Sequence, residues 1–190
     1  MILGIVTARL GSTRLPAKAL LPMADTTMVG HIFNVVLDSE VDQVVLCTPD
    51  EFLKDFVEGD CKVWKGNRDI IGELFYAALK YGADHIVRVT ADCPFITSDI
   101  INKVLSEHTT SDAEYTYNHH DILKSNTKEG IDVEVISFGA LTYLHKTSSE
   151  REHLCTSKLD LKVRRVDMEE ERDVFSVNTL EEYVKAYKEV

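Results

Sequence analysis

Short apolar runs rich in β-branched residues recur along the first half of the chain. They cover residues 2–6, 41–47 and 85–89, and each is followed by a polar or glycine-containing turn and a helix-like segment. Runs of this length and composition predict buried strands, and their alternation with helices predicts parallel pairing through helical crossovers. We therefore expect an α/β protein with a mainly parallel central sheet.

The predicted pattern of helices and strands changes after Tyr115. Before it, helices are expected over residues 28–38, 52–58, 69–81 and 99–108. Ser98 directly precedes the last of these segments and is its expected N-cap. After Tyr115, we expect short strands over 131–135, 162–166 and 174–177 and helices over 138–145 and 179–188. The region around 115–145 is thus expected to form a small β-rich excursion.

Length, charge and cysteine usage narrow the class of protein. A chain of 190 residues with 44% hydrophobic content can close one sizeable core, so we expect one domain, 1–190. A net charge of −11 and a pI near 5.0 argue against nucleic acid or an anionic membrane as a partner. The cysteines show no metal or disulfide pattern, and the N-terminal apolar run meets Arg9 too early for a signal peptide or spanning helix. A cytoplasmic protein that binds small molecules is the expectation.

A basic loop follows the first predicted strand. Residues 8–18 read Ala-Arg-Leu-Gly-Ser-Thr-Arg-Leu-Pro-Ala-Lys, with Arg9, Arg14 and Lys18 but no acid, in a chain with 21 Lys+Arg against 32 Asp+Glu. On that acidic background the loop suits a small polyanion better than a polymer. Open α/β sheets bind ligands at the carboxyl ends of strands, where backbone N–H groups are expected to be free. The alternative is an ordinary exposed loop with solvated cations.

The complete sequence of residues 8–18 closely resembles the opening motif of the cytidylyltransferases that make CMP-activated sugars. The spore-coat polysaccharide biosynthesis protein F group is most similar, with the acylneuraminate and 3-deoxy-manno-octulosonate cytidylyltransferases further off. In that family this loop wraps the triphosphate of CTP. The resemblance implies triphosphate contacts for Ala8, Arg9, Gly11, Ser12, Arg14 and Lys18, with catalytic roles for Arg9 and Lys18. Ala17 stands where the family usually has glycine, which raises the question of a positive φ there.

A second stretch of resemblance, residues 87–95, ends a strand with an acid and a proline. Asp92 is suited to hold a hard, oxygen-liganded cation, and the alternative is a turn-forming residue that caps the following helix. The resemblance implies that Asp92 binds Mg²⁺ and that Thr90 lies at the nucleotide. The family usually has a second metal ligand in a Val-Asp-Thr motif, whereas this chain has Asn178 there. We expect Asn178 to offer a carbonyl oxygen but to weaken divalent-cation binding.

Three further segments resemble the family's base-reading and acceptor-sugar regions. Gly66 and Asn67 lie where the family reads its base, next to Asp69, which by itself suits the start of a helix. Alternation puts Asp132 and Glu134 on one strand face, as hydrogen-bond acceptors or a general base for a hydroxyl, or simply as a solvated face. The resemblance also implies acceptor-sugar contacts for Arg151 and His153, with Arg151 suited to a substrate carboxylate and a polar turn as the alternative.

Taken over nearly the whole chain, the resemblance implies a Rossmann-like fold of the nucleotide-diphospho-sugar transferase type. Residues 1–112 would bind the nucleotide and residues 113–190 the acceptor. The implied reaction is CTP plus a sugar acid or related sugar giving a CMP-sugar and pyrophosphate, with Mg²⁺, in surface polysaccharide biosynthesis. A glycosyltransferase using a nucleotide-sugar is an alternative, although Asp92-Cys93-Pro94 lacks the D-x-D pattern, and a catalytically weakened nucleotide-binding homologue is another. The acceptor sugar and homodimer formation stay open.

Overall fold

A single sheet of seven strands organises the molecule. The computed structural model describes residues 1–64, 69–118, 129–154 and 160–190. The strands are β1 (Ile2–Thr7), β4 (Gln43–Thr48), β5 (Asp60–Val63), β6 (His85–Thr90), β7 (Tyr115–Tyr117), β8 (Val133–Ser137) and β9 (Val163–Arg165). Their order across the sheet is β5-β4-β1-β6-β8-β7-β9. Only β8 runs antiparallel to its neighbours in this sheet, so the predicted mainly parallel sheet is confirmed.

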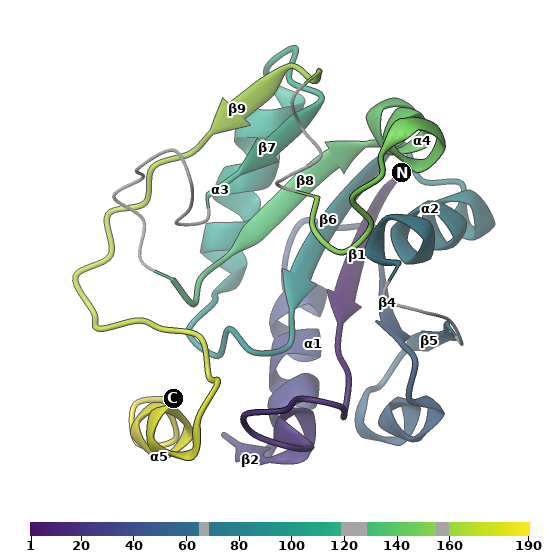
Figure 1. The fold of residues 1–190 in the computed structure, drawn as a ribbon. Helices are drawn as coiled ribbons and strands as arrows, with labels where there is room; N and C mark the ends of the chain where they lie inside the picture. The colour runs from purple at the N-terminus through teal and green to yellow at the C-terminus, as the bar shows by residue number, and fades with distance from the viewer. Residues whose placement is uncertain (65–68, 119–128, 155–159) are drawn as a thin grey trace.

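Helices cover both faces of the sheet (Figure 1). They are α1 (Met28–Leu37), α2 (Ile70–Tyr81), α3 (Ser98–Thr109), α4 (Phe138–Thr147) and α5 (Leu180–Ala186). The core on one face joins β1 and β6 to α1 and α3, and the core on the other face joins them to α2 and α4. Burial on both faces is why the strands read as continuous apolar runs. No described helix has the length and apolar character needed to cross a bilayer.

The loop after β1 folds back through short elements. A 3₁₀ turn, η1 (Lys18–Leu20), is followed by a small hairpin of β2 (Pro22–Met23) and β3 (Thr26–Thr27). The hydroxyl of Tyr183 on α5 donates to the carbonyl of Pro22 (2.8 Å), so the end of the chain lies beside this hairpin. The C-terminal helix therefore lies near the segment that follows the loop of residues 8–18.

Three local expectations were wrong. The segment predicted as a helix over 52–58 is a 3₁₀ helix, η2 (Glu51–Phe56). Residues 174–177 form no strand, because the segment follows the loop after β6 and bonds to it through the amide of Val177 and the carbonyl of Asp92 (2.8 Å). The N-cap of α3 is Thr97, whose hydroxyl accepts from the amide of Ile100 (3.3 Å), because Ser98 already lies inside the helix.

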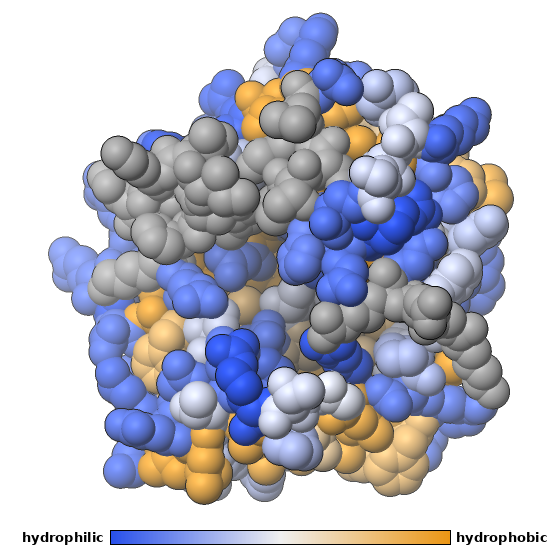
Figure 2. All heavy atoms as spheres, in the orientation of Figure 1, coloured by the Kyte–Doolittle hydropathy of each residue, from blue (hydrophilic) through white to orange (hydrophobic). Residues whose placement is uncertain are grey.

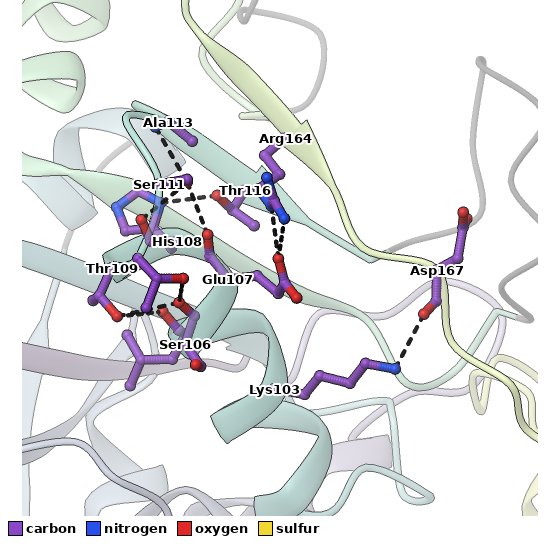
Figure 3. Close-up of polar contacts among 12 residues, drawn as sticks. Lys103, Ser106, Glu107, His108, Thr109, Ser111, Ala113, Thr116, Arg164 and Asp167 are labelled. Atoms are coloured by element: carbon purple, nitrogen blue, oxygen red, sulfur yellow. Dashed lines mark hydrogen bonds and ion pairs between the residues drawn. The ribbon is translucent and has the colours of Figure 1, made fainter.

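The β-rich region after residue 115 extends the main sheet and is attached to α3 (Figure 3). On α3, His108 contacts Thr116 of β7 (Nδ1 to Oγ1, 2.9 Å), and Glu107 accepts from Arg164 of β9 (Nε to Oε2, 2.8 Å). Further along, Lys103 donates to the carbonyl of Asp167 (3.3 Å). These contacts hold the returning chain along α3 before it reaches the carboxyl ends of the strands.

Candidate active site

A cavity of about 610 Å³ opens at the carboxyl ends of the central strands. Thr7 of β1 and Thr90 of β6 are in register, so the loops that follow these two strands start side by side. In Figure 1 the arrowheads of β1 and β6 point toward the loop of residues 8–18, and in Figure 2 hydrophilic side chains surround a hollow in the same face. The lining comes from that loop, the end of β6, α2 and the segments 129–134, 152–153 and 176–178. Segments far apart in sequence thus meet at one site.

The basic loop is closed by its own backbone. Leu10 accepts from the amides of Ser12 and Ala17 (both 2.9 Å), and its own amide donates to the carboxylate of Asp50 at 2.7 Å. Ala17 closes the loop with a left-handed backbone, φ +56°, so the position usually occupied by glycine in the family does require a positive φ. An alanine is strained in this conformation where glycine is not. The loop is therefore held in shape at a local cost in stability.

The predicted triphosphate residues mostly face the cavity. Ala8, Arg9, Ser12, Arg14 and Lys18 line it. Gly11 does not belong to the lining, and a Cβ added to it would meet nothing within 4 Å. The expectation of free backbone amides was wrong for those of Ala8, Leu10, Ser12, Ala17 and Lys18, which already donate to protein oxygens. The side-chain cations, more than the backbone, make this loop an anion site.

Lys18 connects the loop to the two predicted metal ligands. Its ammonium donates to the carboxylate of Asp92 (2.7 Å), to the amide oxygen of Asn178 (3.2 Å) and to the carbonyl of Val177 (2.7 Å). The side chain of Lys18 is only 13% exposed, so this ion pair is well shielded from water. No local pattern in the sequence indicates that Lys18, 74 positions before Asp92, pairs with it.

Asp92 is a charged group of the site and not a helix cap. Burial by itself would raise the pKa of Asp92, but the ammonium of Lys18 and a hydrogen bond from Thr90 lower it below its usual range. The cap of α3 is supplied by Thr97, so the alternative of a turn-forming cap does not hold. Asp92 is therefore ionised at neutral pH, beside the cationic loop.

Asp132 lines the same cavity as Asp92. It precedes β8, and its Oδ1 atom is buried with no hydrogen-bond partner among the described residues. Burial, together with the nearby charges of Glu129, Glu134 and Asp92, raises the pKa of Asp132 to about 7. A buried carboxyl with a pKa near neutrality can take up a proton at physiological pH.

Gly130 brings the segment before β8 close to the backbone of Phe175. Its φ is +101°, and a Cβ there would lie 2.1 Å from the backbone of Phe175. The thiol of Cys93 contacts both segments: its sulfur lies 3.9 Å from Oδ2 of Asp132 and 3.7 Å from the hydroxyl of Ser176. Only a glycine permits this close approach.

Glu134 lies deeper than Asp132 and is already paired. It is opposite Arg88 in the β6–β8 ladder, and its carboxylate accepts from Arg88 and from the hydroxyl of Tyr115. With 6% exposure, it does not form a solvated strand face. Arg88 is a site residue that sequence analysis missed, although a charge in the middle of an apolar strand was the available signal.

Glu73 was also missed. It lies in the first turn of α2, lines the cavity and is only 6% exposed. Its carboxylate makes no hydrogen bond or ion pair within the part of the chain that the structure describes. Burial raises the pKa of Glu73 to about 7, against the opposing effect of Arg88. In the sequence Glu73 reads as an ordinary helix residue, because nothing local shows that its side chain is buried at a cavity.

The predicted acceptor residues Arg151 and His153 separate in the structure. His153 lines the cavity with Glu152. Arg151 donates to both oxygens of Asp69 (Nε to Oδ1 2.9 Å, Nη2 to Oδ2 3.0 Å) and to the carbonyl of His145. Asp69 also caps α2 by accepting from the amide of Gly72, which confirms the expectation that it suits the start of a helix. The guanidinium of Arg151 is thus occupied by protein groups, which argues against the predicted contact with a substrate carboxylate. Gly66 and Asn67 lie outside the described residues.

The oxygen atoms of Asp92 and Asn178 fit a shared cation. Both accept from the same Lys18 ammonium, so they converge on one point. Mg²⁺ in nucleotide sites commonly uses one or two protein oxygens and completes its shell with phosphates and water. No group of three or more His, Cys, Asp or Glu side chains within the described ranges could hold a metal. The donor set therefore suits a cation held jointly with a bound nucleotide.

Comparison with known proteins assigns the chain to a family. The family model described as cytidylyltransferase matches residues 3–189, and the chain belongs to this family. The spore coat polysaccharide biosynthesis protein SpsF of Bacillus subtilis (strain 168) is 28% identical over 127 residues, or 61% of this chain and 53% of the relative. The chain spans about half the length of the curated relatives it matches.

Solved structures agree with this assignment. A cytidylyltransferase from Leptospira borgpetersenii serovar Hardjo-bovis (strain JB197) has a TM-score of 0.78 at 28% identity, covering 96% of this chain and 83% of that chain. The CMP:2-keto-3-deoxy-manno-octonic acid synthetase complexed with CTP has a TM-score of 0.76 at 16% identity, covering 98% and 97%. The predicted family resemblance and fold class are confirmed.

Proposed function

We propose that the protein transfers CMP from CTP to a sugar hydroxyl and releases pyrophosphate. The observation that carries this proposal is that the ammonium of Lys18, at the end of the cationic loop, donates to both Asp92 and Asn178 inside one cavity. Membership of the cytidylyltransferase family supports CTP as the nucleotide. The related synthetase solved with CTP has the same fold. In this proposal residues 1–112 bind the nucleotide, and residues 113–190 contribute most of the acceptor side.

The basic loop would bind the part of CTP that leaves. Arg9 and Arg14 line the cavity and would hold the β- and γ-phosphates, with Ser12 as a hydroxyl donor. Lys18 would neutralise charge between the α- and β-phosphates as the bond to pyrophosphate breaks. Gly66 and Asn67 remain our candidates for contacts with the cytosine base.

The chemical step is an in-line displacement. The acceptor oxygen forms a bond to the α-phosphorus, the bond from that phosphorus to the β-bridging oxygen breaks, and pyrophosphate carries away the electron pair. Oδ1 of Asp132 would take the hydroxyl proton, because this atom is buried, has no hydrogen-bond partner among the described residues and belongs to a carboxyl whose pKa is raised to about 7. Glu134 would hold the acceptor side in place through Arg88.

A divalent cation, which we expect to be Mg²⁺, would be held by Asp92 and Asn178. Such an ion supplies charge neutralisation at the α-phosphate. This chain has one carboxylate and one amide at that position, so the protein contributes a single negative charge through these two side chains.

Pyrophosphate release tests this function. The protein is incubated with each of the four nucleoside triphosphates, Mg²⁺ and a panel of sugars, and CTP is expected to give the fastest release. Asp132→Asn should lower kcat about 100-fold or more with little change in the KM for CTP. Preference for another triphosphate, or transfer from a preformed nucleotide-sugar without pyrophosphate, would contradict the proposal.

A further inference from the structure

Arg151 joins three separate segments beside the cavity. Its guanidinium donates to both carboxylate oxygens of Asp69 (Nε to Oδ1 2.9 Å, Nη2 to Oδ2 3.0 Å), the residue that caps α2. It also donates to the carbonyl of His145 in the last turn of α4 (3.1 Å). The carbonyl of Arg151 accepts from the amide of Ile71 in α2 at 3.3 Å. The side chain and backbone of one residue thus fasten its own segment to two helices.

The ion pair between Arg151 and Asp69 has the geometry of a strong contact. Two N–H donors meet the two oxygens of one carboxylate, and the side chains are 27% and 29% exposed. A bidentate pair of this kind fixes orientation as well as distance. Burial by itself would raise the pKa of Asp69, but the guanidinium of Arg151 and the amide of Gly72 hold it below its usual range. The pair therefore stays charged at neutral pH.

The two helices held by Arg151 are packed against each other. They lie side by side on one face of the sheet (Figure 1). The ring of His145 stacks on the ring of Phe75 in α2, with centroids 4.2 Å apart and an interplanar angle of 5°. His145 therefore contacts α2 through its ring and Arg151 through its carbonyl. The groups that hold Arg151 thus belong to a packed part of the fold.

The segment that contains Arg151 contributes to the cavity. Glu152 and His153, which follow it directly, both line the cavity. Their amides donate to the carboxylate of Glu150 (2.7 and 3.2 Å), so this stretch forms a compact turn. The side chain of Arg151 connects the turn to α2, so it helps to determine where Glu152 and His153 lie.

The other end of the ion pair lies beside the part of the chain that we expect to contact the nucleotide. Asp69 directly follows Gly66 and Asn67, our candidates for the cytosine base, with one residue between. Ile70 and Glu73, in the first turn of α2, line the cavity. A nucleotide held here would restrain the chain on both sides of Asp69. The ion pair is therefore a direct link from the nucleotide side to the turn.

We propose that Arg151 is a positioning residue that couples nucleotide binding to the placement of Glu152 and His153. This inference rests on the proposed function and concerns the same cavity. Bound CTP restrains Asp69, and the ion pair passes this restraint to the turn that carries Glu152 and His153. The acceptor then meets these two side chains already in position, so it binds more tightly after CTP than before it.

Hydrogen exchange tests this coupling without an acceptor. The full chain is measured with and without the non-hydrolysable α,β-methylene analogue of CTP, and amide exchange is followed in residues 148–154. We expect the analogue to slow exchange there at least fivefold in the original protein. Arg151→Met should remove most of this protection, while the calorimetric Kd of the analogue changes less than threefold.

Two further variants separate the coupling from folding. Asp69→Asn retains an N-cap for α2, because asparagine caps helices about as well as aspartate, but it removes the charge that pairs with Arg151. It should therefore lose the protection as Arg151→Met does. Arg164→Met breaks the ion pair between β9 and Glu107 outside the cavity lining, and it should respond to the analogue as the original protein does.

Steady-state pyrophosphate release gives a second readout, with the sugar that reacts fastest in the panel. Arg151→Met should raise the KM for that sugar at least tenfold and the KM for CTP less than threefold. Equal losses for both substrates would assign Arg151 to the fold alone and overturn the inference.

The exchange measurement also distinguishes this inference from the proposed function. If the analogue binds but exchange in residues 148–154 does not respond, or responds equally in Arg151→Met, the inference is overturned and the cytidylyltransferase proposal is left intact. If the analogue does not bind the original protein, both are overturned.

Discussion

The cationic and the acidic ends of the cavity are built in different ways. The cationic end comes from one continuous segment, residues 8–18, in which Arg9, Arg14 and Lys18 are a few positions apart. The acidic end is assembled from α2, the segment 129–134 and the segment around 152, which are far apart in the chain. The first can be recognised as a motif, whereas the second exists only after the sheet has formed. The following predictions probe this difference, beginning with the largest expected effect.

Lys18 is the one residue that belongs to both the loop and the metal-ligand region. Lys18→Met should lower kcat/KM for CTP about 1000-fold, because it removes a proposed phosphate ligand and the ammonium that pairs with the carboxylate of Asp92. Steady-state pyrophosphate release gives this ratio. Lys188→Met, at an exposed lysine near the C-terminus, is the control. A loss smaller than tenfold would show that the two ends of the cavity work independently.

Glu73 is expected to destabilise the folded protein at neutral and higher pH. Its ordinary pKa of 4.5 is raised to about 7 in the fold by burial, opposed by Arg88 and reinforced by Asp69. The folded state holds this proton more tightly, so stability falls as the pH rises from 4.5 through 7 and is then constant. Glu73→Gln should therefore raise the free energy of unfolding by about 3 kcal/mol at pH 8 and by little at pH 4.5.

Urea denaturation of Glu73→Gln and of the original protein at both pH values checks this expectation. Glu40→Gln should change neither value, since its side chain is exposed. A Glu73→Gln protein that is less stable at pH 8 would mean that the carboxylate of Glu73 stabilises the fold.

A substitution at Asn178 tests whether its side-chain oxygen binds a divalent cation or only accepts from the ammonium of Lys18. Asn178→Asp adds a second carboxylate beside Asp92 and should tighten Mn²⁺ binding in the presence of CTP about tenfold. Electron paramagnetic resonance of free Mn²⁺ measures this affinity without turnover. Asn102→Asp, on α3 and away from the cavity, is the matched control. If the affinity stays unchanged, Asn178 serves only to hold the ammonium of Lys18.

Ala17 gives the smallest expected effect. Its φ of +56° is strained for alanine, so Ala17→Gly should raise the free energy of unfolding by about 1 kcal/mol. Ala24 has a φ of +49° outside the cavity lining, so Ala24→Gly is the matched comparison for backbone strain alone. Both are measured by urea denaturation. A loss of stability in Ala17→Gly would show that the side chain of Ala17 supports the loop.

The core of the fold could be predicted because its signals are local. The apolar runs that became β1, β4 and β6 are buried on both faces, so they needed no alternation to be recognised as strands. The segment 174–177 reads as a strand for the same reason, yet it pairs with the loop at Asp92 and joins no ladder. Its apolar residues Val174 and Val177 enter the core, and composition cannot distinguish a paired from an unpaired buried segment.

By itself, the sequence determined the α/β class, the cationic loop and Asp92, because each depends on residues that are neighbours along the chain. Tertiary structure decided that Lys18 pairs with Asp92 across 74 positions, that Arg88 is taken by Glu134, and that Glu73 is buried at the cavity. Those outcomes depend on strand order and register, which bring distant charges together in a space that excludes water. The field that a charge experiences is a property of its surroundings in the folded molecule, and sequence neighbours alone do not determine it.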